Sequence, residues 1–333
     1  MTKKAGLVAL GLACAPLWAQ SYVERDDVIS FMHAMAQNHG MDEAYLQSLA
    51  AAVEKDDDVL RKISTPAEKT KTWAEYRPIF LDDARIENGV KFWNEHAEVL
   101  AKAEAEYGVP PEVIVAIIGV ETRYGKVTGT TPVFAALMTL CFDYTPRAPF
   151  FCEQVDYFLR LSQRENFNPL RIKGSYAGAM GMAQFMPSSY FNDTVDYDGN
   201  GVVNLWESPA DAIGSIGNYL KVRGWEKEGA LVYRLPVEPA TTALLDKHQP
   251  HVPLAQLRED VALKNDENFM NWTQKYPDEN VGGLVLEGVD GKEYWLTHNN
   301  FYVITRYNTS PLYAMAVIDL GRRIVEERQS QTK

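Results

Sequence analysis

The segment Pro111–Tyr124 restricts the fold more than any other part of the sequence. Every residue from Val113 to Val120 is aliphatic or glycine, so a helix at this position would be apolar on nearly every face. Pro111 suits the first turn of such a helix, and Gly108 suits the end of a preceding helix predicted over about 88–107. A helix without a polar face belongs in a protein interior, so we expect the rest of the chain to pack around this one.

The remaining sequence predicts a mainly helical protein with one β-rich insert. Apolar residues recur at helical spacing over 28–53 and again over 311–327. Over 231–296 the pattern changes to short Val, Leu and Tyr runs that are broken by Gly, Pro and Asn, as in strands. We therefore predict an α+β fold, mainly α. Its expected parts are an N-terminal helical domain (20–87), a core (88–228), a small β-rich insert (229–300) and a C-terminal return to the helical body (301–333).

The first residues predict export. Two lysines precede the apolar stretch 5–17, and a small-residue cleavage site follows at Ala19, which together are typical of a secretory signal peptide over 1–19. The stretch is too short to span a bilayer. We expect a periplasmic protein, either free or anchored to the outer membrane through a lipid on Cys14. The match to a lipoprotein processing site is incomplete because Gly11 stands where leucine is expected.

Cys141 and Cys152 are the two cysteines outside the predicted signal peptide. Disulfides persist in exported proteins, so we predict that these two cysteines are bridged. Two buried thiols are the alternative, because the sequence cannot establish the geometry that a bridge needs. No Cys/His cluster has the spacing of a zinc site.

Glu121 ends the apolar run of the predicted buried helix. Apolar surroundings and the negative end of the helix dipole both penalise the charged carboxylate, so we expect a raised pKa, as a general acid near neutral pH requires. Arg123 lies on a different helix face and need not neutralise Glu121. A helix-end salt bridge with Arg123 or a distant lysine is the alternative, so this residue alone does not establish a catalytic site.

The segment 174–190 combines glycine and alanine with the polar side chains of Ser175, Tyr176 and Gln184. Small residues let the backbone approach a ligand closely, and hydroxyl and amide groups suit sugars. By composition alone, a tightly packed core turn explains the segment at least as well. Other motifs must decide between the two.

Three motifs occur in one order: Val120-Glu121-Thr122-x-Tyr124-Gly125, the segment 174–189, and Phe301-Tyr302-Val303-Ile304-Thr305-Arg306-Tyr307-Asn308 with Ser310 and Tyr313. Together they resemble the membrane-bound lytic murein transglycosylase B family, from roughly residue 27 to the C-terminus. The resemblance implies a lysozyme-like core with an additional helical domain and a small β-rich insert. It also implies that Glu121 is the catalytic acid and base. Cleft residues implied by the motifs are Ser175, Gln184, Tyr307 and Asn308, with an expected aromatic wall of Tyr76, Tyr219 and Tyr313.

The segment 196–207 has the spacing of an EF-hand calcium loop. Oxygen-bearing side chains stand at its first, third and fifth positions, Gly201 at the sixth and Glu207 at the twelfth. The family resemblance also implies a calcium-type loop here, and an Asx-rich turn without metal is the alternative. A single hand in an exported chain favours a structural ion over a calcium sensor. The predicted Ca²⁺ ligands are Asp196, Asp198, Asn200, Val202, Asn204 and Glu207.

The motifs show no second carboxylate near Glu121 that could act as nucleophile or base, which hydrolysing glycosidases need. The resemblance implies instead that Glu121 protonates the glycosidic oxygen between N-acetylmuramic acid and N-acetylglucosamine and then deprotonates the muramyl C6 hydroxyl. A 1,6-anhydromuramyl end results, while Ser175 and Asn308 hold the substrate. A hydrolytic muramidase is one alternative. A non-catalytic, calcium-stabilised peptidoglycan-binding protein is another, although the intact Glu121 argues against it.

The expected partner is the glycan strand of peptidoglycan, and complexes of cell-wall synthesis or division are further candidates. A formal net charge of -12 leaves no basic excess with which to neutralise phosphates, so we do not expect nucleic acid as a partner. We expect no organic cofactor and a monomeric protein.

Overall fold

The computed structural model of the protein describes residues 21–65, 71–241 and 246–331. The predicted signal peptide and Cys14 lie outside these ranges. Contacts divide the chain into two compact units that meet between Lys55 and Asp56, and each unit is described by itself. The four-part division expected from the sequence stays a prediction. No helix within the described ranges is both long and apolar enough to cross a membrane.

The smaller unit is a helical pair. It contains the 3-10 turn η1 (Tyr22–Glu24) and the helices α1 (Asp26–His39) and α2 (Glu43–Ala51). Helix α1 ends at Gly40, which adopts a left-handed conformation with φ 64° and needs no Cβ there. The two helices bury the predicted apolar positions, including Met32 and Leu46, against each other.

The larger unit is mainly helical, which confirms the predicted fold class. Its helices outside the insert are α3 (Asp57–Ser64), α4 (Trp73–Tyr76), α5 (Asp83–Glu95), α6 (Ala97–Tyr107), α7 (Pro111–Thr122), α8 (Val133–Phe142), α9 (Ala148–Arg164), α10 (Pro187–Asp193), α11 (Pro209–Val222), α14 (Asn299–Thr305) and α15 (Pro311–Gln331). Short 3-10 turns are η3 (Arg77–Ile79), η4 (Thr145–Arg147) and η5 (Pro169–Arg171), and the strands β1 (Thr131–Pro132) and β2 (Lys173–Gly174) pair antiparallel.

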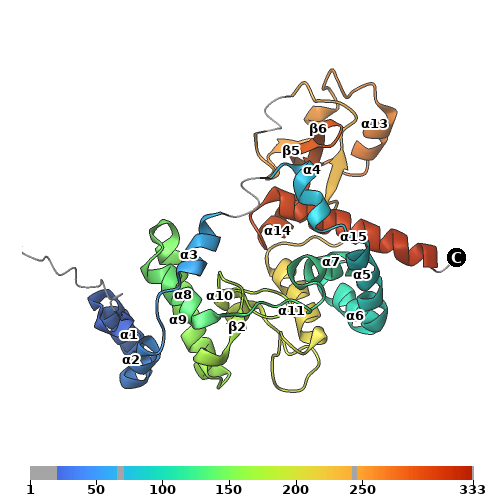
Figure 1. The fold of residues 1–333 in the computed structure, drawn as a ribbon. Coiled ribbons are helices and arrows are strands. Elements are labelled where there is room, and N and C mark those ends of the chain that lie inside the picture. The colour runs from blue at the N-terminus through green and yellow to red at the C-terminus, as the bar shows by residue number, and fades with distance from the viewer. Residues whose placement is uncertain (1–20, 66–70, 242–245, 332–333) are drawn as a thin grey trace, which may run out of the picture. The chain divides into compact units, whose positions relative to one another are not determined.

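Helix α7 lies inside this unit, as its sequence predicts. Its residues from Ile114 to Ile118 have no exposed surface. Helices α5, α6, α11 and α15 all pack against it, and Figure 1 shows α15 running beside α7 and α5. Gly321 of α15 permits this close approach, because a Cβ there would lie 3.0 Å from the Glu112 carbonyl oxygen of α7.

A disulfide joins α8 to α9. It links Cys141 to Cys152, whose Cα atoms lie 4.6 Å apart, so the predicted bridge is confirmed. The bridge closes the loop between the two helices, which carries η4. This tether reduces the number of conformations that the loop can adopt.

The insert is a small β structure with its own core. Its strands are β3 (Val232–Arg234), β4 (Val252–Pro253), β5 (Asn280–Gly288) and β6 (Gly291–Thr297), in the antiparallel order β3-β6-β5-β4. Figure 1 shows β5, β6 and the helix α13 (Glu267–Thr273) within one lobe, which also contains α12 (Leu254–Leu257). The insert buries a separate apolar cluster that includes Leu254, Phe269 and Leu296. It can therefore keep its shape without contributing to the packing around α7.

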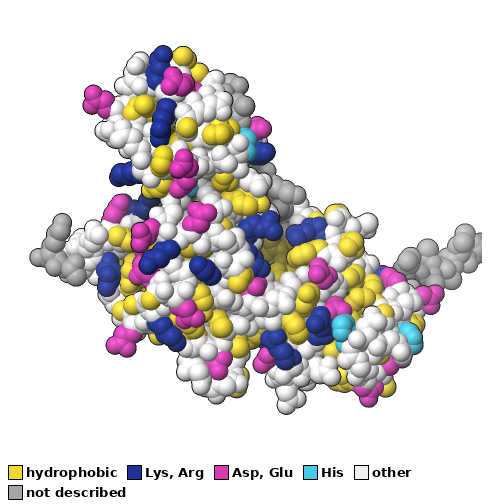
Figure 2. Space-filling view, turned by 180° about the vertical axis from the view of Figure 1, so that it is seen from behind, with side chains coloured by type: hydrophobic (Ala, Val, Ile, Leu, Met, Phe, Trp, Pro, Cys, Tyr) yellow, Lys and Arg dark blue, Asp and Glu magenta, His cyan; other side chains and the backbone are white. Residues whose placement is uncertain are grey.

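Surface charge of both signs covers the face of the molecule shown in Figure 2. Lys and Arg side chains are interspersed there with Asp and Glu side chains.

His298 lies between β6 and α14 and is buried, with 1% of its surface exposed. Its Nδ1 atom lies 2.5 Å from Oε2 of Glu279, and its ring meets the rings of Trp272 and Tyr276 at centroid distances of 5.2 Å. Its Nε2 atom has no hydrogen-bond partner among the described residues. Burial lowers the pKa of His298 from its ordinary value of 6.5, although the Glu279 carboxylate acts in the opposite direction. The folded insert therefore accommodates the neutral imidazole.

Acidification is expected to destabilise the insert through His298. The unfolded chain takes up the proton near pH 6.5 and the folded chain only at lower pH, so the free energy of unfolding falls as the pH drops through and below 6.5. His298→Asn keeps a donor for Glu279 but cannot ionise, so its unfolding free energy should fall less. Urea unfolding followed by tryptophan fluorescence at several pH values measures both slopes. Equal slopes in the two proteins would contradict this account.

Candidate active site

Glu121 lies one residue before the end of α7, at a sharp turn of the chain. Arg123, Tyr124 and Gly125 follow with φ values of 50°, 61° and 82°, a left-handed conformation that is uncommon for residues other than glycine. The backbone turns away from the helix axis at this point. Glu121 itself is half-buried, so the turn places its carboxyl group at the boundary between core and solvent.

Two side chains of the Glu121 motif hold the turn. The Thr122 hydroxyl accepts a hydrogen bond from the Gly125 amide (3.0 Å) and donates to the Met182 carbonyl (3.1 Å). The Tyr124 hydroxyl donates to the Arg85 carbonyl at 2.8 Å. Its ring fits because Gly119 of α7 has no side chain: a Cβ there would lie 2.6 Å from the Tyr124 hydroxyl oxygen. The motif thus fixes the backbone around Glu121.

Tyr313 contacts the carboxyl group directly. Its hydroxyl donates a hydrogen bond of 2.6 Å to Oε1 of Glu121, and the residue is buried at the start of α15. Burial, together with the neighbouring Glu121 charge, raises the pKa of Tyr313 well above its ordinary value. The hydroxyl therefore stays protonated and keeps its role as donor. Tyr313 of α15 is thus a polar partner of Glu121, the candidate catalytic residue of α7.

Tyrosine rings extend from Tyr313 along one side of the site. Tyr307 stacks on Tyr313 with a centroid distance of 6.4 Å, and Tyr219 packs against Tyr307 at 4.8 Å. The Tyr307 hydroxyl donates to the Ala183 carbonyl, and the Tyr219 hydroxyl donates to the Arg306 carbonyl. Tyr307 and Tyr219 are thereby each held by a ring contact and by a hydrogen bond to the backbone.

An ion pair supports the far end of this tyrosine wall, which we define as Tyr219, Tyr307 and Tyr313. The Arg223 guanidinium lies 3.4 Å from the centre of the Tyr219 ring. Arg223 also donates to the Asp193 carboxylate at 2.8 Å. The two charges are partly buried, so their attraction is screened less than at an open surface. Arg223 is therefore held against the outer ring of the wall.

A cleft of about 530 Å³ opens beside Glu121. Of the residues expected from sequence, it is lined by Glu121, Ser175, Gln184, Tyr219, Tyr307 and Asn308. Among the described residues that line it, Glu121 is the one acidic side chain. The volume of the cleft and its mixture of polar and aromatic side chains suit a ligand larger than a small-molecule fragment.

Three polar side chains present complementary groups to the cleft. The Ser175 hydroxyl oxygen accepts from the amides of Ala177 and Ala179, which leaves its proton to be donated to a ligand. The Gln184 amide nitrogen donates to two backbone carbonyls, which leaves the amide oxygen as an acceptor. Asn308 uses its oxygen to accept from the Ser310 amide, which leaves its nitrogen as a donor. The cleft can thus recognise hydroxyl and acetamido groups of a sugar.

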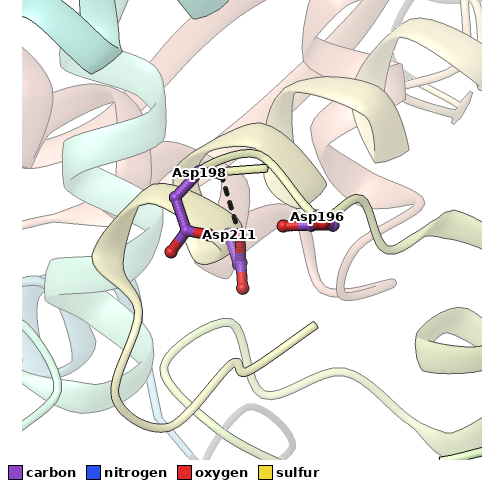
Figure 3. A group of neighbouring side chains, drawn as sticks. All are labelled: Asp196, Asp198 and Asp211. Carbon is purple, nitrogen blue, oxygen red and sulfur yellow. Dashed lines mark hydrogen bonds between the residues drawn. The ribbon is translucent and has the colours of Figure 1, made fainter. Parts of the chain in front are cut away.

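A second cluster of functional groups lies in the predicted calcium loop. Carboxylate oxygens of Asp196, Asp198 and Asp211 all lie within 4.8 Å of one another, and Figure 3 shows the three side chains converging. Three converging carboxylates repel one another unless a cation lies between them, and oxygen atoms are the ligands that Ca²⁺ prefers. This cluster fits a calcium ion.

The composition of this cluster differs from the expected ligand set. Asp211, in the first turn of α11, lies beyond the twelve-residue EF-hand pattern and was not predicted from sequence. Glu207, predicted at the twelfth position, is exposed and lies outside the group of three described carboxylates. Instead it belongs to a local turn in which Asn204 accepts from the Glu207 amide. Asp211 is buried and also accepts from the amides of Tyr197 and Asn204, so it organises the loop as well.

The sequence matches the family described as the transglycosylase SLT domain over residues 24–322. The chain belongs to this family. It is 39% identical over 307 residues to the membrane-bound lytic murein transglycosylase B of Escherichia coli strain K12, covering 90% of this chain and 82% of that protein. Among solved structures, it is similar to the soluble lytic transglycosylase SltB1 of Pseudomonas aeruginosa, with 43% identity, 91% and 99% coverage and a TM-score of 0.82. It is also similar to Escherichia coli Slt35 in complex with calcium, with 38% identity, 90% and 92% coverage and a TM-score of 0.77.

The cleft of this SLT-domain protein contains residues that the motifs missed, and two expected residues, Tyr76 and Tyr313, do not line it. Tyr313 is buried and reaches the site through its hydrogen bond to Glu121. Arg147 lines the cleft from the disulfide-closed loop and Phe150 from the first turn of α9. Arg306 lines it from the end of α14. Tyr76 does not line the cleft, because it is 2% exposed in α4 and packs against Phe80. Its ring therefore has no face for a sugar. The closely spaced cysteines were the one sequence signal that pointed toward the loop carrying Arg147.

Proposed function

We infer that the protein is a lytic transglycosylase that cleaves the β-1,4 bond between N-acetylmuramic acid and N-acetylglucosamine in peptidoglycan and leaves 1,6-anhydromuramyl ends. The observation that carries this proposal is the position of Glu121. Its carboxyl group stands at the end of a buried helix, lines the cleft and accepts a hydrogen bond from the Tyr313 hydroxyl. Membership in the transglycosylase SLT domain family supports it, as does the similarity to the lytic murein transglycosylase B of Escherichia coli.

Glu121 would perform both proton transfers. It gives its proton to the glycosidic oxygen of the leaving N-acetylglucosamine as the bond from that oxygen to C1 of N-acetylmuramic acid breaks. The carboxylate then takes the proton of the muramyl C6 hydroxyl as O6 bonds to C1. Atoms balance without water, and Glu121 ends protonated, ready for the next cycle. The Tyr313 hydroxyl would stabilise the carboxylate between the two steps, because a hydrogen bond to an ionised oxygen is stronger than one to a neutral acid.

The acid content of the cleft favours this route over hydrolysis. A retaining hydrolase needs a second carboxylate about 5 Å from the first as nucleophile, and an inverting one needs a base further away. Glu121 is the one acid among the described residues that line the cleft. The attacking group would therefore come from the substrate itself.

Substrate contacts would follow from the polar groups of the cleft. Ser175 and Asn308 offer donors and Gln184 offers an acceptor, which suit the acetamido and hydroxyl groups of the two sugars. Tyr219 and Tyr307 supply ring surface for the sugar faces. Arg147 and Arg306 add positive charge, which suits the carboxylates of the stem peptides.

Calcium would stabilise the loop that begins at Asp196. The converging carboxylates of Asp196, Asp198 and Asp211 support this proposal, and so does the similarity to the Slt35 structure described as a calcium complex. We place Asp211 in the ligand set and Glu207 outside it. Asn200, the Val202 carbonyl and Asn204, which the sequence also predicted as ligands, complete the proposed set.

The proposed compartment is the periplasm, reached through the predicted signal peptide over 1–19. The disulfide between Cys141 and Cys152 supports an oxidising compartment. Lipid attachment at Cys14 and association with cell-wall synthesis or division complexes stay predictions from the sequence and the family resemblance.

Replacing Glu121 tests the catalytic proposal. Glu121→Gln preserves the shape of the side chain but can neither donate nor recover the proton, so the rate of 1,6-anhydromuropeptide release should fall about a hundred- to ten-thousandfold or more. Mass spectrometry of products from purified sacculi measures the rate and also separates anhydro from reducing ends. Glu112→Gln, on the same helix but outside the cleft, is the matched control and should keep wild-type activity. A folded Glu121→Gln protein with near wild-type release would show that another group does the chemistry.

Tyr313 is expected to assist catalysis through its hydroxyl alone. Tyr313→Phe keeps the ring in the tyrosine wall but removes the donor to Glu121, which should lower the rate roughly ten- to a hundredfold with little change in melting temperature. Tyr157→Phe is the control, since Tyr157 of α9 packs its ring on Phe191 of α10 and does not line the cleft. If Tyr313→Phe and wild type turn over equally, the hydroxyl has no part in the proton transfers.

Calcium binding should depend on Asp211 and not on Glu207. Added Ca²⁺ should raise the melting temperature of the wild type, because an ion that binds the folded state stabilises it by linkage. Asp196→Asn and Asp211→Asn should abolish the shift, whereas Glu207→Gln should retain most of it. Calorimetry with Ca²⁺ and with EDTA measures each shift against the same variant without the ion. If Glu207→Gln alone lost the shift, Glu207 would be a ligand and the twelve-residue pattern expected from sequence would be correct.

A further inference from the structure

A second cavity, distinct from the cleft, lies on the β insert. It has a volume of about 420 Å³ and is bounded by β3, β6 and the residues at the start of α13. None of the residues that line it lines the cleft beside Glu121. The apolar cluster of the insert, with Leu235 and Phe269 fully or nearly buried, supports its walls. The cavity is thus a feature of the insert itself.

Two tyrosine rings in this cavity have partners that restrict their rotation. Tyr233 stacks on Trp272 with a centroid distance of 4.1 Å and an angle of 27° between the ring planes. The Tyr294 hydroxyl donates to the Glu238 carboxylate at 2.8 Å. Both rings also line the cavity. A ring that is fixed before binding loses little conformational entropy when a flat ligand face packs on it.

The polar side chains around these rings carry both signs of charge. Two acids, Asp266 and Glu293, and two bases, Arg234 and Lys292, line the cavity together with Asn268. Asp266 also caps α13 by accepting from the Phe269 amide at 2.7 Å, which holds its carboxylate in place. Balanced charge disfavours a phosphate or a polyanion. Carboxylate, amide and ammonium groups around aromatic rings are instead the combination that hydrogen-bonds sugar hydroxyls while the rings cover the apolar sugar face.

We propose that the cavity on the insert binds a glycan strand of peptidoglycan at a distance from the bond that is cut. The proposal rests on the proposed function for its substrate class. A strand that is already bound at the insert stays near the cleft, so its effective concentration at the cleft rises. The cavity should therefore matter for long strands and sacculi, and not for a fragment that fills only the cleft.

A pair of exposed-residue variants tests this site. Asn268→Ala/Lys292→Ala removes two polar groups from the cavity, and both residues are exposed, so the fold should be kept. Asn271→Ala/Lys275→Ala removes the same residue types from exposed positions of the same insert outside the cavity, and is the matched control. Both pairs are placed in full-length Glu121→Gln protein, so that the glycan is not cut during binding.

Binding is measured by co-sedimentation with purified sacculi and by calorimetry with chitotetraose. The cavity variant should bind sacculi several-fold more weakly than the control variant, and should lose a chitotetraose site that the control retains. With Glu121 restored, it should show a raised KM for sacculi and an unchanged rate on a short soluble muropeptide. Tyr294→Ala should give the same pattern.

Equal binding of sacculi and chitotetraose by the cavity and control variants would overturn the proposal. Weaker binding of sacculi with unchanged binding of chitotetraose would overturn the sugar assignment and point to the stem peptide. These outcomes are independent of catalysis. Failure of the proposed function would appear separately, as wild-type protein that releases no anhydromuropeptides from sacculi.

Discussion

Helix α7 has no polar face, and burying it requires α5, α6, α11 and α15 to surround it. A helix that is packed on all sides cannot shift without exposing apolar surface or opening voids, each of which costs free energy. Its last turn is therefore a fixed platform in the larger unit. Glu121 stands on that platform, and the left-handed residues after it take the chain away so that the carboxyl group meets the cleft.

The tyrosine wall links the end of α7 to the predicted calcium loop, residues 196–207. Tyr313 contacts Glu121 at one end of the wall, and Arg223 supports Tyr219 at the other. Asp193, the partner of Arg223, ends α10 just before the loop, while Tyr219 belongs to α11, which begins just after it. The loop thus joins the two segments that hold the outer ring. An ion that stiffens the loop would stabilise the cleft wall without touching the substrate.

Periodicity and motifs predicted the parts of the molecule that depend on local sequence. The buried α7, the β insert and the position of Glu121 at a helix end all follow from runs of neighbouring residues. The contact between Tyr313 and Glu121 spans 192 positions and depends on how α15 packs on α7, which no local pattern encodes. Asp211 was missed for a related reason: the EF-hand pattern ends at its twelfth residue, whereas the fold of α11 brings a later carboxylate back to the loop.

A single carboxyl group places a strict demand on the substrate. In the proposed reaction, once Glu121 has given up its proton, no other acid among the described lining residues would be available to activate water or attack the sugar. The attacking group would be the C6 hydroxyl that the muramyl ring already carries, and an attack within one molecule loses no translational freedom. Glu121, the proposed proton donor, would then act as the base that this hydroxyl requires. The tyrosine wall would help this route, because Tyr313 contacts one oxygen of the carboxylate and the hydroxyls of all three rings are already engaged, which would leave fewer sites for water beside the reacting carbon.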